Sequence, residues 1–322
     1  MPTYLLHGQQ LNHYPVGVLK TLANLFRGGL MGAAEVVPGV SGGTLALIVG
    51  IYETLINSIA NVVLAVRQFL GFSGGKPSAA RGTATLKALP WSLLVPVALG
   101  MGAMVVLGAK IIEPLLEEQP IAMKALFFGL VIAGAYVPAH MVTKVGGWSL
   151  LYALLGLVAA VIVFFLTGLP QGNVTDPSLI AVFFSAAIAI CALVLPGVSG
   201  SFLLLTVGMY DPTIAAVNDR NFAYLAVFAL GAILGLAIFV SLLKWLLENR
   251  ARITLVIITG LMIGSLRALW PWQGADRELL APVDQVGTAI IMFVIGALFV
   301  SVLLIVERRL GASEEQVDLL ES

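Results

Sequence analysis

The residues with the clearest chemical potential lie in two short Pro-Gly-Val-Ser-Gly stretches, which begin at Pro38 and at Pro196. Proline removes a helical hydrogen-bond donor and glycine weakens a helix, so each stretch predicts a helix break followed by a new helix. The first turn of the new helix presents free backbone N–H groups and the positive end of the helix dipole. Each stretch is therefore expected to attract negative charge.

The loop residues themselves suit an anion, and phosphate in particular. Glycine lets a ligand approach the backbone closely, and the serine hydroxyl adds a donor. A serine that only caps its helix has the same geometry, so that alternative stays open. The predicted binding residues are Pro38, Gly39, Ser41, Gly42, Gly43, Thr44, Pro196, Gly197, Ser199, Gly200 and Ser201.

Three ionisable residues lie within apolar runs, where such groups are functional candidates. Arg27 and Arg267 are predicted to hold the phosphate with the loops, because the arginine fork bonds phosphate bidentately and keeps its charge. Glu35 lies three residues before the first break and is predicted to contact substrate or to exchange a proton. Simpler roles remain open: Arg27 as an inner-surface charge, Arg267 as a side chain that reaches the outer interface, and Glu35 as a structural partner.

The two loops belong to a longer internal repeat. Residues 37–53 read VPGVSGGTLALIVGIYE, and residues 195–211 read LPGVSGSFLLLTVGMYD. A shared PGVSG followed by a Val-Gly-x-Tyr frame indicates a duplication rather than a chance similarity of apolar runs. Both copies close on an acid, Glu53 and Asp211. These two are secondary candidates for ion coupling, or residues that only cap their helices or face water.

Composition sets the class of protein that must position these groups. Of 322 residues, 59% are hydrophobic and 11% are charged, against about 25% charged in soluble domains. These values exclude disorder, a coiled coil, a disulfide scaffold and an ordinary soluble enzyme. Basic and acidic residues number 17 each, so no nucleic-acid footprint is present. With a single Cys191 and three scattered His, we expect no metal site and no cofactor.

Apolar runs of membrane-spanning length recur along the chain, which predicts an all-α polytopic integral membrane protein. The runs on either side of each Pro-Gly step have no polar loop between them. We interpret each such pair as a re-entrant hairpin with broken helices, and two full spans joined by a tight turn as the alternative. The runs lie at 16–36, 40–66, 91–113, 121–141, 149–167, 178–195, 199–217, 222–243, 253–270 and 286–306.

An odd number of crossings separates the two copies on either interpretation, so the second copy is predicted to be inverted. Inverted repeats with broken helices that meet near the midplane are typical of secondary transporters. A symmetric bundle that is only kinked at the Pro-Gly steps is the alternative. We expect one transmembrane domain over 1–310, with repeat one at 16–141, a connecting span at 149–167, repeat two at 178–270, a last span at 286–306 and an acidic cytoplasmic tail at 311–322.

Loop charges orient the chain. The loops at 67–90, 142–148 and 244–252 are basic, whereas those at 113–120 and 168–177 contain acids and no Lys or Arg. This alternation matches the positive-inside rule and places both termini in the cytoplasm. The N-terminus has no basic start and no long apolar core, so we expect no cleavable signal peptide.

The motifs also resemble those of a known family. FRGGLMGAAEVVPGVSGGTLALIVGIYETLI, LVLPGVSGSFLLLTVGMY and GLMIGSLRALWPW are similar to signatures of the polyprenyl-phosphate transporter family, over roughly residues 20–310. One departure is Glu35, where that family is expected to carry Asp. The resemblance implies a flippase that returns undecaprenyl or another polyprenyl phosphate from the outer to the cytoplasmic leaflet for cell-envelope synthesis. It also implies coupling to a proton or sodium gradient, and a homo-oligomer is compatible with it.

Two other classes remain as alternatives. Integral-membrane polyprenyl-diphosphate phosphatases also use inverted repeats and Pro-Gly-x-Ser loops, but their chemistry needs an Arg beside the loop serine, a Glu pair and a His. Here Ser41 and Ser199 are followed by small residues, and neither loop has a His nearby. Binding of a phosphate group without its hydrolysis therefore fits these loops better, and we expect that the protein is not an enzyme. An ion or small-anion carrier would share the architecture without a groove open to lipid.

Overall fold

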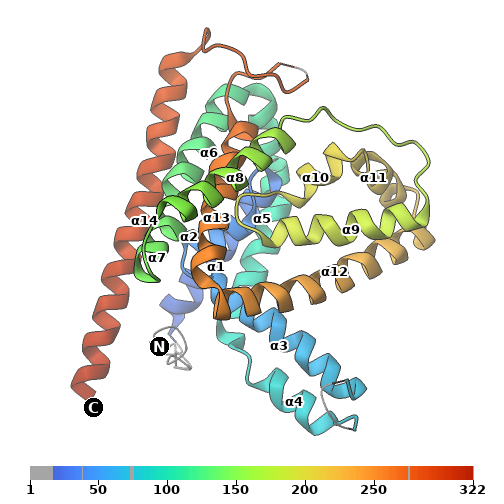
Figure 1. Ribbon diagram of the computed structural model, residues 1–322, viewed down its shortest axis with the longest axis vertical. Helices are drawn as coiled ribbons and strands as arrows, with labels where there is room; N and C mark the ends of the chain where they lie inside the picture. Colours follow the sequence, from blue (N-terminus) through green and yellow to red (C-terminus); the bar gives the residue numbers. More distant parts are fainter. Residues whose placement is uncertain (1–16, 38, 73–75, 275, 322) are drawn as a thin grey trace.

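The computed structural model describes residues 17–37, 39–72, 76–274 and 276–321, and every named element in these ranges is a helix (Figure 1). The elements confirm an all-α polytopic class. They are α1 (Val18–Val36), α2 (Gly42–Ile48), α3 (Tyr52–Leu70), α4 (Ala79–Lys87), α5 (Trp91–Glu118), α6 (Pro120–Gly134), α7 (Tyr136–Lys144), α8 (Leu150–Leu166), α9 (Leu179–Val194), α10 (Gly200–Thr206), α11 (Tyr210–Asn218), α12 (Phe222–Asn249), α13 (Ala251–Ser265), the 3₁₀ helix η1 (Leu266–Leu269) and α14 (Val286–Glu321).

The helix breaks predicted at the Pro-Gly steps are confirmed, between α1 and α2 and between α9 and α10. Each run that follows was expected as one helix, over 40–66 and 199–217, and this was wrong. Gly50 and Gly208 end α2 and α10 with left-handed φ values of 70° and 74°, a conformation that glycine adopts without strain. The second break is sharp, because α10 and α11 meet at an angle of 106°.

Two further bounds differ from the sequence prediction. The loop at 67–90 contains α4, whose first turn is capped by the Ser78 hydroxyl accepting from Arg81 N–H. The last helix was expected to end at 306, but α14 continues to Glu321. The start of α4 is marked by a capping serine rather than by hydrophobicity, so the pattern of apolar runs does not indicate this helix.

Five helical segments in the described ranges are long and apolar enough to cross a membrane, or six if the bent pair α10–α11 is one span. They are α5, α6 with α7, α12, α13 with η1, and α14 as far as Val306. Apolar helices α8 and α9 are shorter. This number is smaller than the ten predicted runs, because α2, α8, α9 and α10 are too short, and α1 and α3 are long enough but not apolar enough.

The duplication extends beyond the loops into the helix packing. α5 and α12 are 28 residues each, and α6 and α13 are 15 residues each. α1 packs along α5 as α9 packs along α12. Gly100 on α5 lies against the Leu25 carbonyl with no room for a Cβ atom, and Gly231 on α12 lies against the Phe183 carbonyl in the same way. Small residues allow this close approach of helices in membranes. The two copies thus repeat a packing unit, while their opposite orientation stays a prediction.

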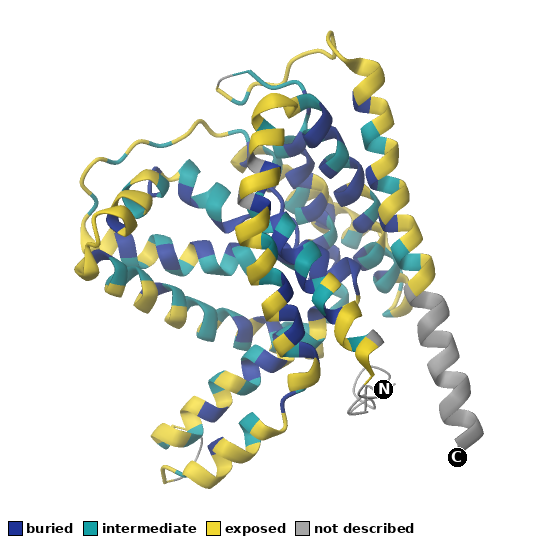
Figure 2. Cartoon of the chain, turned by 180° about the vertical axis from the view of Figure 1, so that it is seen from behind, coloured by how far each residue is buried: buried dark blue, intermediate teal, exposed yellow. Residues whose placement is uncertain are grey.

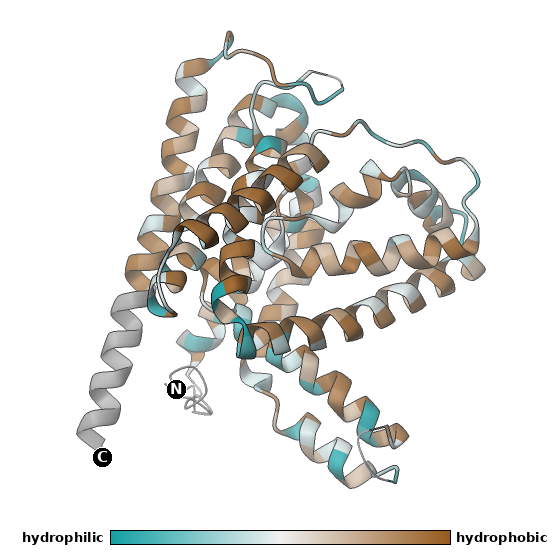
Figure 3. Ribbon diagram, viewed as in Figure 1, coloured by the Kyte–Doolittle hydropathy of each residue, from teal (hydrophilic) through white to brown (hydrophobic). Residues whose placement is uncertain are grey.

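The core lies where α1, α2, α5, α6 and α13 meet, and Figure 2 shows buried residues concentrated in these central helices. The outer faces of α8, α9, α12 and α14 are largely apolar although exposed, as the brown ribbons of Figure 3 show. An apolar surface of this extent is expected of a protein whose solvent is lipid.

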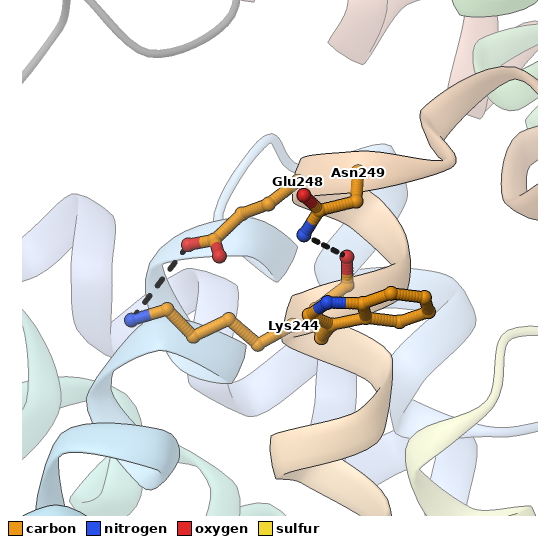
Figure 4. A network of polar contacts seen from close by, with 4 residues as sticks. Lys244, Glu248 and Asn249 are labelled. Atoms are coloured by element: carbon orange, nitrogen blue, oxygen red, sulfur yellow. Dashed lines mark hydrogen bonds and ion pairs between the residues drawn. The ribbon is translucent and has the colours of Figure 1, made fainter.

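The C-terminal end of α12 is polar. Lys244 forms an ion pair with Glu248 at 3.9 Å, and Asn249 donates a hydrogen bond to the Trp245 carbonyl at 2.9 Å (Figure 4). These groups precede Arg250, which lies between α12 and α13. The turn therefore belongs with the basic loops that were predicted to face the cytoplasm.

Candidate functional site

The two Pro-Gly loops contact each other directly. The Gly197 N–H of the second loop donates to Thr44 Oγ1 at 2.8 Å, and the Thr44 side chain is fully buried. Next to this bond, Ser41 Oγ donates to the Leu193 carbonyl at 2.9 Å and the Tyr52 hydroxyl donates to the Val194 carbonyl at 3.1 Å. Residues about 150 positions apart in the chain therefore meet here. We call this set of contacts between the two Pro-Gly loops and the helices next to them the joint.

The turn at each loop depends on glycine. Gly39 and Gly197 adopt φ values of 90° and 88°, in the left-handed region. A Cβ at Gly39 would lie 3.0 Å from the Ala268 side chain, and one at Gly197 would lie 2.7 Å from the Met262 backbone. Both loops therefore pack on α13 and η1. Pro38 lies outside the described residues, and Pro196 is buried.

The loop serines act as helix caps. Ser41 Oγ accepts from Gly43 N–H at 3.1 Å, and Ser199 Oγ accepts from Phe202 N–H at 3.4 Å. Ser199 also shares a hydrogen bond with the Ser201 hydroxyl at 2.9 Å. Both serines are buried, with an exposed fraction of 0% for Ser41 and 3% for Ser199. The capping alternative thus accounts for both hydroxyls in this conformation, and neither is open to a ligand.

The glycines beside the serines are equally confined. A Cβ at Gly43 would lie 2.8 Å from the Val194 carbonyl, and one at Gly200 would lie 2.5 Å from the Ala189 carbonyl. Each residue therefore lets α2 or α10 pack on backbone of α9. In this conformation the missing side chain of Gly43 serves contact between the two repeats, whereas that of Gly200 serves packing of α10 on α9 within the second repeat.

Glu35 occupies the position where an anion was predicted. Its Oε1 accepts from Gly42 N–H at 2.8 Å, so the N-terminus of α2 is already met by a carboxylate of the chain itself. The repeat offset is 158 residues, from Pro38 to Pro196, which makes Leu193 the equivalent of Glu35. The second loop therefore has no counterpart of this acid, and the two halves of the joint differ in charge.

Arg267 lies on η1 with an incomplete set of partners. Its Nη2 approaches the Arg277 carbonyl at 3.5 Å, and its guanidinium carbon lies 4.7 Å from the centre of the Phe164 ring. Within the described part of the chain, Arg267 Nε is the one buried side-chain nitrogen or oxygen without a hydrogen-bond partner. Buried polar groups are nearly always paired, and one left unpaired costs about 1–3 kcal/mol or more when it is charged. This nitrogen is therefore a candidate contact for an anion.

Comparison with known proteins identifies the family of this chain. Residues 31–285 match the family described as undecaprenyl phosphate translocase-like. The chain belongs to this family. A polyprenyl-phosphate transporter of Vibrio cholerae serotype O1 is 37% identical over 255 residues, which cover 78% of each chain. A polyprenyl-phosphate transporter of Staphylococcus aureus is 26% identical over 262 residues, 77% of this chain and 86% of the relative. No solved structure matches.

A second arginine of this translocase-like chain was missed by the sequence prediction. Arg277 Nη1 donates to the Leu169 carbonyl at 2.9 Å and to Thr206 Oγ1 at 3.1 Å, and its guanidinium carbon lies 4.4 Å from the Phe202 ring centre. Burial lowers the pKa of Arg277, but an arginine stays charged near neutral pH. No sequence pattern indicated this residue, because it lies in a polar connection and its partners come from distant segments.

The remaining predicted residues lie apart from Arg267 or at the surface. Arg27 Nη1 donates to Asn24 Oδ1 at 3.0 Å on α1, about 12 Å along the helix from Glu35. Glu53 and Asp211 are exposed acids in the first turns of α3 and α11, where they favour the helix dipole. These positions fit the simpler alternatives that the sequence left open for them.

Proposed function

We propose that this protein transports undecaprenyl phosphate or another polyprenyl phosphate across the membrane. The observation that carries the proposal is the buried Arg267 Nε without a hydrogen-bond partner. An apolar membrane protein that belongs to a translocase-like family has a use for such a donor, because a phosphate in a low-dielectric site needs charged and directional partners. The names of both relatives support the same substrate class.

In this proposal Arg267 receives the phosphate headgroup, and Arg277 adds positive charge beside it. The planar fork of Arg267 bonds phosphate oxygens bidentately. The prenyl tail stays in the bilayer, since the exposed surface of the surrounding helices is apolar. Arg27 on α1 is a further cation in this proposal. It meets the headgroup at another stage of its movement across the membrane.

The joint between the Pro-Gly loops serves as the element that changes state. The structure holds it closed through Ser41, Thr44 and Glu35, whose partners are all protein groups. When the joint opens, the Gly42 and Gly197 N–H groups and the loop hydroxyls are free to bind phosphate. Glu35 then loses its backbone partner and exchanges a proton, with Glu53 and Asp211 as secondary coupling groups. A ligand drives such a change only through a difference in its affinity for the two states.

The proposed direction is from the outer to the cytoplasmic leaflet of a bacterial inner membrane, with both termini inside. The alternation of basic and acidic loops supports this orientation. The repeats are proposed to be inverted around the joint, as in other transporters with broken helices. We propose that the chain forms one transmembrane domain, which consists of two repeats and a last span.

The role of Arg267 in transport is tested in proteoliposomes that carry undecaprenyl phosphate in one leaflet. Arg267→Ala should abolish movement of the lipid while the protein stays folded, and Arg267→Lys should restore only part of it. Arg252→Ala is the matched control, because Arg252 stacks on Tyr152 at 3.8 Å and donates to the Gly147 carbonyl at 2.8 Å. Wild-type rates in Arg267→Ala would place the headgroup site elsewhere.

The two alternative classes are separated by substrate. Purified protein given undecaprenyl diphosphate should release no inorganic phosphate, since the loops lack the nucleophilic machinery. Phosphate release that disappears in Ser41→Ala or Ser199→Ala would make the protein a phosphatase. Uptake of inorganic phosphate without lipid movement would make it a small-anion carrier.

A further inference from the structure

An apolar pocket of about 150 Å³ lies between the start of α6, the start of α14 and the segment that follows η1. Half of its lining residues are aromatic, namely Phe128, Trp270, Trp272 and Phe293. The other half are Ala125, Pro271, Ala289 and Ile290. The rings pack edge to face, with centroids 6.2 Å apart for Phe128 and Trp270 and 5.4 Å apart for the two tryptophans. Edge-to-face packing of this kind holds the wall in one arrangement.

The pocket wall offers almost nothing polar to an occupant. Trp270 Nε1 donates to the Leu280 carbonyl at 3.0 Å, and Trp272 Nε1 donates to the Asp284 carbonyl at 2.9 Å. Both indole N–H groups are therefore already satisfied, and the rings present their apolar surfaces. Tryptophans at a membrane interface commonly anchor a protein among lipid headgroups, but here they also enclose a cavity. The pocket opens outward beside Ile290, which is 58% exposed.

A cation lies at one edge of this apolar pocket. Lys124 precedes the wall residue Ala125 on α6, and its Nζ lies 3.4 Å from Gln273 Oε1. The amide nitrogen of the same Gln273 donates to the backbone carbonyl of Arg267 at 2.6 Å. One glutamine thus connects the lysine at the pocket to the backbone of the arginine proposed to bind phosphate. An apolar slot with a cation at its edge matches an amphiphile that has an anionic head.

We propose that this pocket binds the isoprene unit next to the phosphate of the polyprenyl lipid, with the head on Lys124. The inference rests on the proposed function and adds a place for the tail. An apolar cavity of about 150 Å³ takes a molecule the size of benzene, which is about the size of one isoprene unit. The rest of the tail leaves past Ile290 into the bilayer. The pocket therefore has room for the branched, unsaturated start of the chain.

The test uses the full chain in detergent and farnesyl phosphate with a photoreactive diazirine near its phosphate. Crosslinks are expected in the segments that hold Trp270 and Phe293. Ala289→Phe fills the pocket and should lower crosslinking about tenfold or more, because apolar burial of the isoprene is lost. Ile291→Phe is the matched control, since Ile291 is 61% exposed and lies on the other side of α14. Ile290→Trp covers the mouth and repeats the test without a change in the core.

Each outcome decides between specific possibilities. Equal crosslinking in wild type, Ala289→Phe and Ile290→Trp overturns the pocket assignment. If the wild type still transports the lipid in that case, the proposed function is upheld. Competition by phosphatidylglycerol as strong as that by undecaprenyl phosphate overturns the prenyl assignment in favour of an acyl chain. A wild type that neither crosslinks nor moves the lipid overturns both proposals.

Discussion

Replacing Thr44 by valine removes one hydrogen-bond acceptor from the joint between the two loops. Valine has nearly the shape of threonine but lacks the hydroxyl, so the replacement of this fully buried side chain changes hydrogen bonding more than volume. The Gly197 N–H, which donates to Thr44 Oγ1 at 2.8 Å, is then left buried without a partner. Such a loss costs about 1–3 kcal/mol, which corresponds to a shift of about 5-fold to 150-fold in an equilibrium between two states.

We expect Thr44→Val to lower the midpoint of thermal unfolding in detergent by several degrees. Thr259→Val is the matched control, because the Thr259 hydroxyl donates to the Leu255 carbonyl of its own helix at 2.8 Å and its loss leaves no N–H group unpaired. Amide hydrogen exchange in the segment around Gly197 should also become faster in Thr44→Val alone. If both variants unfold at the same temperature and exchange alike, the loops are not joined by this bond.

Three further predictions follow from the packing, the acid and the loop charges. Gly100→Ala and Gly231→Ala should each destabilise the protein by about 1–3 kcal/mol, because both glycines lie against a carbonyl, whereas Gly102→Ala should be neutral since nothing lies within 4 Å of its Cβ position; equal unfolding midpoints for all three would contradict the repeated packing unit. Glu35→Gln keeps an acceptor for Gly42 N–H but cannot exchange a proton, so its transport should lose the dependence on a pH gradient. The control is Glu117→Gln at an exposed position, whose transport should keep that dependence. An unchanged dependence in Glu35→Gln removes Glu35 from coupling. In a Cys191→Ala background, a membrane-impermeant maleimide should label Asn173→Cys only from outside and Asn249→Cys only from inside, and the reverse pattern overturns the orientation.

Much of the fold could be predicted from local chemistry. Proline cannot donate a helical hydrogen bond, and the left-handed turns at Gly39 and Gly197 need glycine, so the breaks after α1 and α9 were visible in the sequence. The breaks at Gly50 and Gly208 were marked by the same residue type, but a single glycine inside an apolar run is compatible with a continuous helix. Only packing decides between the two.

The site was predictable in its residue types but not in its pairings. Arg267 stood out because a charge in an apolar run is rare. Arg277 did not, because its role depends on Thr206 and Leu169, which reach it from other segments. The serines were predicted to bind a ligand, with helix capping as the alternative, and in this conformation they cap α2 and α10.

The sequence by itself determined the apolar helices, the breaks at the two Pro-Gly steps and the duplication, because these follow from residue type, spacing and self-similarity. The tertiary structure decided which polar groups are satisfied. Glu35 meets Gly42, Thr44 meets Gly197 across 153 residues, and Arg267 Nε meets no partner within the described chain. A buried hydrogen bond depends on the position of two atoms to within a fraction of an ångström, and that position is set by the packing of whole helices rather than by the residues nearby in the chain.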